Sequence, residues 1–265
     1  LIVVVGFSAY PVAFALFISF TRTNGLTFEW RWFENYIAIF SDPIVHQVFL
    51  NNITFLISVP LVIFVAVIVS VLLFEQVRGW KFFRVIFFLP NVLSVAVIGI
   101  MFRNAFGFDG AVNQALALFG VEPIQFFTQG STAIAIIILA LVWSGFGYQA
   151  LLLLAGLTSI NPAVFEAAAI DGAGWWKRLW YITLPNIRRV LGFVFIINVL
   201  YTFSSLFGFV FVMTAGGPGF DTTTIDYLVY LRAFSSSNLG SGAALAVVLF
   251  IFIGLLTLLQ NKVFK

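Results

Sequence analysis

The sequence predicts an all-α integral membrane protein in which a single domain, residues 1–265, contains six transmembrane helices. Apolar residues make up 62% of the chain and charged residues only 9%, whereas about a quarter of the residues of a soluble domain are charged. Six apolar stretches contain no Asp, Glu, Lys or Arg, and each has roughly the length needed to cross about 30 Å of hydrocarbon. The six stretches are residues 1–20, 51–74, 85–102, 132–158, 191–213 and 241–260.

The connections between these stretches alternate in charge. Nine of the thirteen Lys and Arg residues lie after the second stretch, after the fourth stretch or at the C-terminus, and the other connections hold seven of the ten acidic residues. Because Lys and Arg are enriched on the cytoplasmic side of membrane proteins, we expect both termini and residues 161–185 to be cytoplasmic. The basic residues are spread over loops, so the net charge of +3 indicates membrane topology rather than nucleic-acid binding.

The first stretch, 1–20, is longer than the apolar core of a signal peptide, which has about 7 to 15 residues. We therefore expect a first transmembrane helix, preceded in the complete protein by a cytoplasmic leader. The loop after it contains Trp30, Trp32, Phe33 and Tyr36. Aromatic residues are enriched at membrane–water interfaces, so we interpret this loop as an anchoring belt, with a partner-binding surface as the alternative.

The residue types that are missing exclude several functions. The chain has no Cys and a single His, His46, which excludes a disulfide framework and a thiolate or histidine metal site. Its apolar stretches lack the ionisable groups that proton- or sodium-driven carriers normally need. They also lack the His, Cys and carboxylate side chains that an integral-membrane enzyme would use for catalysis. No phosphate-binding G-x-x-x-x-G-K-[ST] motif occurs, so we expect this chain to bind no cofactor. The energy for transport must then come from another protein, unless the chain is a passive facilitator or channel.

A short helix is predicted in the cytoplasmic segment 161–185. Asn161 is a good N-cap, and Pro162 suits the first helical position because its missing N–H is not needed there. Gly172 is expected to end the helix in the left-handed conformation. A helix of about ten residues is too short to be stable alone in water, so it needs a surface to lie on.

The spacing within this segment resembles the EAA-x3-G-x9-I-x-LP pattern of the membrane subunits of binding-protein-dependent ABC sugar importers. The resemblance implies a type I ABC importer permease fold, in which 162–172 is a coupling helix between spans four and five, docked in a groove of a separate ATPase. A helix on lipid headgroups and a plain cytoplasmic hairpin are the alternatives. The residues that we assign to coupling are Glu166, Ala167, Ala168, Asp171, Gly172, Ile182, Leu184 and Pro185.

Two further segments extend the resemblance. Residues 110–120 match a G-x-x-N-x-x-L-x-x-x-G pattern, and Gly216-Gly217-Pro218 precedes a threonine cluster, as in the maltose and glycerol-3-phosphate class of permeases. This likeness implies a protein of the bacterial plasma (inner) membrane that pairs with a second, similar permease. It also implies two ATPase subunits, which would bind ATP and Mg, and an extracytoplasmic solute-binding protein.

Uncharged polar and aromatic side chains within the apolar stretches indicate a path for a neutral polar solute. A flat ring beside hydrogen-bonding groups suits a carbohydrate, and we expect a di- or oligosaccharide. Hydrogen bonds between helices and aromatic packing in the core are alternative roles for these residues. Glycerol-3-phosphate or another polar solute is the alternative substrate, and its charge would have to be bound by the second permease. The predicted path residues are Asn91, Trp143, Ser144, Tyr148, Gln149, Asn198, Tyr201 and Ser205.

Overall fold

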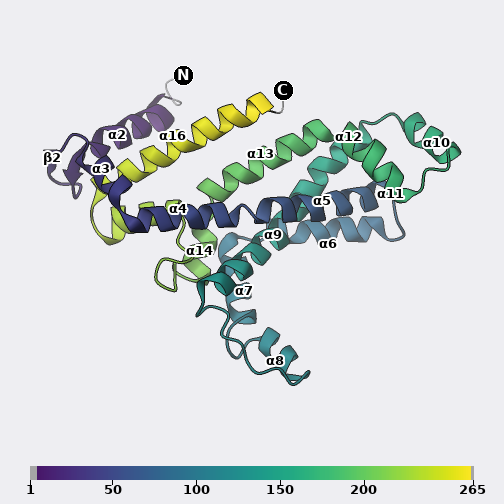
Figure 1. The fold of residues 1–265 in the computed structure, drawn as a ribbon, viewed down its shortest axis with the longest axis horizontal. Coiled ribbons are helices and arrows are strands. Elements are labelled where there is room, and N and C mark those ends of the chain that lie inside the picture. The colour runs from purple at the N-terminus through teal and green to yellow at the C-terminus, as the bar shows by residue number, and fades with distance from the viewer. Residues whose placement is uncertain (1–4, 264–265) are drawn as a thin grey trace.

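The computed structural model describes residues 5–263, which are mostly helical (Figure 1). Residues 1–4, where the first predicted span begins, and residues 264–265 lie outside the described part of the chain. The elements up to residue 117 are η1 (Val5–Ala9), α2 (Tyr10–Ser19), β1 (Thr21–Thr23), β2 (Phe28–Trp30), α3 (Glu34–Ser41), α4 (Pro43–Phe55), α5 (Ser58–Phe74), α6 (Trp80–Val92), α7 (Val95–Ala105) and α8 (Ala111–Ala117). The later elements are α9 (Gly130–Thr158), α10 (Pro162–Ile170), α11 (Trp175–Arg178), η2 (Leu179–Thr183), α12 (Leu184–Asn186), α13 (Arg188–Ser204), α14 (Phe207–Met213), α15 (Ile225–Tyr230), η3 (Leu231–Ser235) and α16 (Leu239–Val263).

Three described helical segments are long and apolar enough to cross a membrane: 43–74, 130–158 and 239–260. Two bent helix pairs, α6 with α7 and α11–α12 with α13, bring the number of candidate spans to five. The remaining apolar helix, α2, is shorter, at 10 residues. All six predicted apolar stretches are therefore helical in the part of the chain that the structure describes.

Two of the predicted spans are not continuous helices. Residues 85–102 fall into α6 and α7, which are bent by 97°. The break lies at Leu93 and Ser94, whose ψ angles of 144° and 148° are extended, and the Ser94 hydroxyl accepts a 3.3 Å hydrogen bond from the Val97 N–H as the N-cap of a new helix. Residues 191–213 are divided between α13 and α14, where the Asp226 carboxylate accepts a 2.7 Å hydrogen bond from the Phe207 N–H.

The core lies between α5 and α9, which cross in the centre of the molecule (Figure 1). Fully buried Ala66 and Ala150 let the helix backbones approach closely, as small residues do in membrane bundles. On α9, Gly147 faces α6, and a Cβ at this position would lie 2.0 Å from the Phe87 carbonyl oxygen. This position therefore requires glycine for α6 and α9 to pack as they do.

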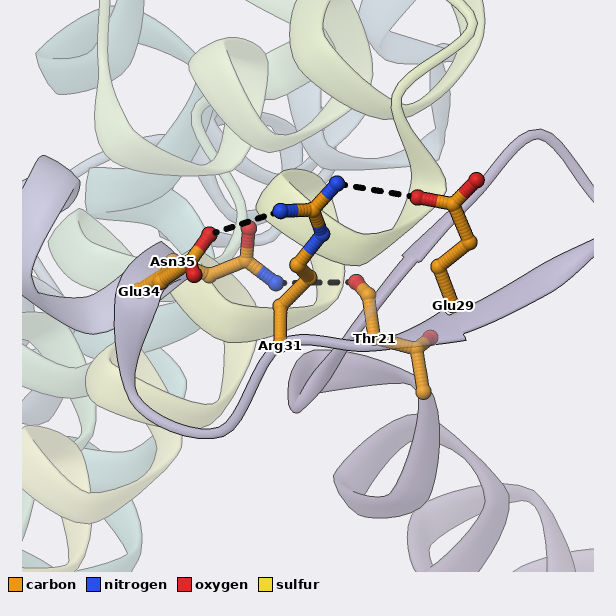
Figure 2. Close-up of polar contacts among 5 residues, drawn as sticks. All are labelled: Thr21, Glu29, Arg31, Glu34 and Asn35. Carbon is orange, nitrogen blue, oxygen red and sulfur yellow. Dashed lines mark hydrogen bonds and ion pairs between the residues drawn. The ribbon is translucent and has the colours of Figure 1, made fainter.

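A rigid hairpin connects α2 to α3 and carries the predicted aromatic belt. Strands β1 and β2 pair in antiparallel register. Figure 2 shows Arg31 between Glu29, at 3.0 Å, and Glu34, at 3.6 Å, while the Asn35 amide donates to the Thr21 carbonyl at 2.9 Å. Exposed ion pairs of this kind contribute little stability, so the Asn35 hydrogen bond is the more important tether. Trp30 and its aromatic neighbours are exposed on this hairpin.

The segment between α14 and α15 is folded onto α4 by two asparagines. The Asn51 amide donates to the carbonyls of Phe220, at 2.8 Å, and Thr223, at 2.9 Å. The fully buried Asn52 accepts from the Ile225 N–H at 2.9 Å and donates to the Thr202 carbonyl at 2.8 Å. The run that follows the Gly-Gly-Pro turn is therefore a packed part of the structure.

Candidate functional site

The helix predicted in the cytoplasmic segment is present as α10. The Asn161 side chain accepts a 3.0 Å hydrogen bond from the Ala163 N–H, and Pro162 is the first helical residue. At the other end Gly172 adopts a φ of +69°. The N–H groups of Gly172 and Ala173 donate to the carbonyls three and five residues earlier in the helix, with the second bond at 2.9 Å to Ala168. This pair of bonds is the Schellman arrangement, which satisfies carbonyls that the helix end leaves free.

α10 lies at one end of the molecule, beyond the ends of α5 and α9 (Figure 1). Of the predicted coupling residues, Glu166, Ala167, Asp171, Gly172 and Pro185 are exposed, whereas Ala168 is buried and Ile182 and Leu184 are half-buried. Ile170 on the same helix has 87% of its surface exposed. The helix therefore presents small, apolar and acidic groups that no other described part of this chain covers.

The segment 161–185 is joined to the C-terminal end of α5 by three contacts. The ring of Phe165 on α10 packs against Phe74, with 5.3 Å between centroids. The Glu75 carboxylate accepts a 3.1 Å hydrogen bond from the Trp175 indole N–H, and its other oxygen lies 3.9 Å from Arg178. The segment 161–185 is thus fixed to a long apolar helix of the core. Sequence reasoning missed these contacts because Glu75 and Trp175 are 100 positions apart.

A second candidate site is a cavity of about 340 Å³ among α5, α6, α7, α9, α13 and α14. It gathers six of the eight predicted path residues from three helices. These six are Asn91, Ser144, Tyr148, Gln149, Asn198 and Tyr201. Ser58 and Thr202 also line the cavity and were not predicted. Helical periodicity could have found Thr202, since it follows Asn198 by four positions on the same helix.

The other two predicted path residues lie elsewhere. Trp143 packs against Phe102, with 5.8 Å between ring centroids, within an apolar cluster that borders the cavity. Ser205 occupies the break between α13 and α14, where its hydroxyl lies 3.4 Å from that of Ser204. Neither residue lines the cavity.

The polar groups of the cavity are only partly satisfied by one another. Gln149 is 6% exposed, and its amide nitrogen makes a long, 3.5 Å contact with the Asn198 side-chain oxygen. Its carbonyl oxygen, Oε1, is buried and has no hydrogen-bond partner. Asn91 donates at 3.4 Å to the Ser144 carbonyl across α6 and α9, so it also links two helices. An unpaired buried oxygen is costly, and a bound hydroxyl group could satisfy it.

The residues that line this cavity include no Asp, Glu, Lys or Arg. A larger groove of about 840 Å³ runs between α4–α5 and α9. Its lining is mostly Ile, Leu, Val and Phe, which give a hydroxylated solute few hydrogen-bonding partners. The smaller, polar cavity is therefore the better candidate for a solute site.

Residues 35–265 match the family described as binding-protein-dependent transport system inner membrane component. The chain belongs to this family. It is the membrane permease subunit of an ABC importer, in which ATP hydrolysis is carried out by separate subunits, and a binding protein is required for transport. Family membership also decides against a passive facilitator or channel.

Relatives and solved structures agree with this assignment. The permease is 35% identical over 246 residues to the sulfoquinovosyl glycerol transport system permease of Agrobacterium fabrum, covering 91% of this chain and 80% of that protein. It is 34% identical over 273 residues to the multiple sugar-binding transport system permease of Streptococcus mutans, covering 100% and 92% of the two chains. A bacterial ABC transporter involved in the import of the polysaccharide alginate contains a chain with the same fold, at a TM-score of 0.86, 20% identity and coverage of 98% and 90%.

Proposed function

We propose that this permease carries a neutral carbohydrate, a di- or oligosaccharide, along a path that includes the polar cavity. The observation that carries the proposal is the buried, unpaired Gln149 Oε1 among uncharged polar side chains of three helices. A sugar hydroxyl can donate to this oxygen, while the half-exposed Tyr148 ring offers a flat surface to the apolar face of a sugar. The permeases named above belong to transport systems for sulfoquinovosyl glycerol and for multiple sugars, which supports a sugar-derived solute here. The neutrality of the solute is argued from the uncharged lining of the cavity alone.

The proposal includes the orientation of the chain and the coupling route. Both termini and α10 are on the cytoplasmic side of the inner membrane, where α10 docks on a partner ATPase that binds ATP and Mg. A second, similar permease completes the cavity. ATP-driven closure of the ATPase pair moves α10, and the Phe165–Phe74 and Glu75–Trp175 contacts carry that motion into α5.

Glycerol-3-phosphate is the second candidate substrate, because a glycerol-3-phosphate permease of Brucella suis is 30% identical over 267 residues. A phosphate needs cationic partners, and none lines this cavity. This substrate therefore requires the second permease to supply Lys or Arg.

Uptake by the complete importer in proteoliposomes tests the proposal, with a panel of disaccharides and glycerol-3-phosphate as solutes. Loss of one neutral hydrogen bond costs about 0.5–1.5 kcal/mol, so Gln149→Leu and Asn198→Ala should weaken apparent sugar affinity by about 2- to 12-fold. Ser205→Ala and Trp143→Phe are matched controls outside the cavity and should leave the affinity unchanged. Unaltered sugar kinetics in both cavity variants would rule out this path.

A further inference from the structure

The N-terminal end of α6 carries a cluster of cations with no acidic partner. Arg78 lies in the turn before the helix, and Lys81 and Arg84 are one turn apart on α6. All three are exposed. Among the described residues, none of the ion pairs involves any of them, and the nearby Glu75 is already engaged by Arg178 and Trp175. The three positive charges at the start of α6 therefore have no acidic partner within the described part of the chain.

An apolar strip runs along α6 from these cations toward the middle of the bundle. The side chains of Phe82, Val85, Leu89 and Val92 are spaced by three or four positions, so they share one face. They are exposed by 67%, 64%, 57% and 71% respectively. From residue 82 to residue 92 the strip is about 15 Å long at 1.5 Å per residue. An aliphatic chain of about a dozen carbons would cover it.

Two further features place this cluster at a membrane surface. The Lys81 ammonium lies 5.8 Å from the centroid of the Trp80 ring, and tryptophan is enriched at the level of lipid headgroups. The helix starts at Gly79 without a side-chain cap, so its positive N-terminal end adds to the cationic field. The site thus pairs an anion-binding head with an apolar tail groove.

We propose that Arg78, Lys81 and Arg84 bind the headgroup of an anionic phospholipid whose acyl chain lies along the exposed strip of α6. Charge complementarity selects this occupant. A transmembrane helix of a partner permease would cover the strip but leave the cations unpaired, because such helices carry few charges. A cytoplasmic protein could pair with the cations but would not reach a strip that extends into the hydrocarbon. An anionic amphiphile pairs with the cations through its headgroup and covers the apolar strip with its acyl chain.

The test measures retained and rebound phosphatidylglycerol on the purified complete importer by native mass spectrometry, with phosphatidylcholine as the neutral comparison. Each basic residue near a membrane surface contributes a factor of about 5 in anionic-lipid affinity. The double variant Arg78→Gln with Arg84→Gln should therefore bind phosphatidylglycerol about 25-fold more weakly. The matched control is Arg188→Gln with Arg189→Gln, two exposed arginines at the start of α13. The exposed apolar residues in the ten positions that follow, Phe193 and Phe195, are two positions apart and therefore do not form a strip along one helix face.

Equal losses in the two double variants would mean diffuse surface attraction and overturn the proposal, as would no loss in either. A second measurement uses the unaltered importer and does not depend on variants folding. Long-chain phosphatidylglycerol should bind at least about tenfold more tightly than a six-carbon-chain analogue, because the strip buries the chain. Full displacement of the lipid by inorganic phosphate would indicate a plain phosphate site and contradict the assignment. Neither measurement uses the transported solute, so the outcome is independent of the proposed carbohydrate function.

Discussion

The end of α10 offers a substitution whose cost comes from backbone conformation alone. Gly172 has a φ of +69°, and a Cβ built there meets nothing within 4 Å. In the left-handed region an L-residue costs about 1–2 kcal/mol, so Gly172→Ala should destabilise the Schellman turn by that amount without any steric clash. Gly174 is the matched control, because its φ is −63° and its Cβ site is equally open. Gly174→Ala should leave the turn at residue 172 unchanged.

The local effect can be measured by hydrogen exchange. A cost of 1–2 kcal/mol raises the open population of the turn by a factor of about 5–30. The backbone N–H groups at positions 172 and 173 donate to Ala169 at 3.2 Å and Ala168 at 2.9 Å, so they report this opening directly. We expect their exchange to accelerate 5- to 30-fold in Gly172→Ala and to stay unchanged in Gly174→Ala.

The functional effect follows from the loosened turn. If α10 transmits motion from the ATPase, Gly172→Ala should lower the number of solute molecules transported per ATP hydrolysed in the reconstituted importer. ATPase activity should be affected less than uptake. The conformational argument would be refuted if Gly172→Ala and Gly174→Ala had the same hydrogen-exchange rates and the same transport per ATP, whether both variants were normal or both impaired.

Three further predictions concern packing and polar contacts. Gly147→Ala places a Cβ 2.0 Å from the Phe87 carbonyl oxygen and should lower stability by about 1–3 kcal/mol or more, seen as a reduced Tm. Gly145→Ala is the control and should be tolerated, because the nearest atom to a Cβ there, on Val62, is 3.8 Å away. Asn52→Leu should cost about 1–3 kcal/mol, because the Ile225 N–H and the Thr202 carbonyl lose their partner; denaturation of the purified complex checks this, and an unchanged Tm would contradict it. Glu75→Ala removes both the ion pair with Arg178 and the hydrogen bond from Trp175; it should change Tm little, since the partly exposed ion pair contributes at most about 1 kcal/mol, yet it should reduce transport per ATP, and normal coupling would argue against this contact as the transmission route.

Local signals were predictable from the sequence because they depend on a few neighbouring residues. Asn161, Pro162 and Gly172 define both ends of α10 through caps that involve no distant contact. The division of 85–102 into α6 and α7 was not predicted, because averaged apolarity gave one continuous span. Ser94, the N-cap of α7, was nevertheless present in the sequence.

The membrane cavity was predicted only in part, because sequence periodicity does not fix how a helix is rotated against its neighbours. Ser144 lines the cavity, whereas the preceding Trp143 points about 100° away around the helix and packs in the apolar cluster that borders it. The contact of Glu75 with Trp175 joins segments 100 positions apart. No local pattern marks such a pair, so only the folded structure could identify it.

Contact between α10 of this permease and the ATPase subunit can be measured by site-directed crosslinking, because the chain has no cysteine of its own and a single introduced one can be labelled. Ala167→Cys, on the exposed face of α10, carries a short photo-crosslinker in the complete importer, with Thr27→Cys on the exposed hairpin at the other end of the molecule (Figure 1) as the control. We predict crosslinks from position 167 to the ATPase that change with nucleotide, and none to the ATPase from position 27. Crosslinks from position 167 to lipid alone would contradict the coupling role of α10.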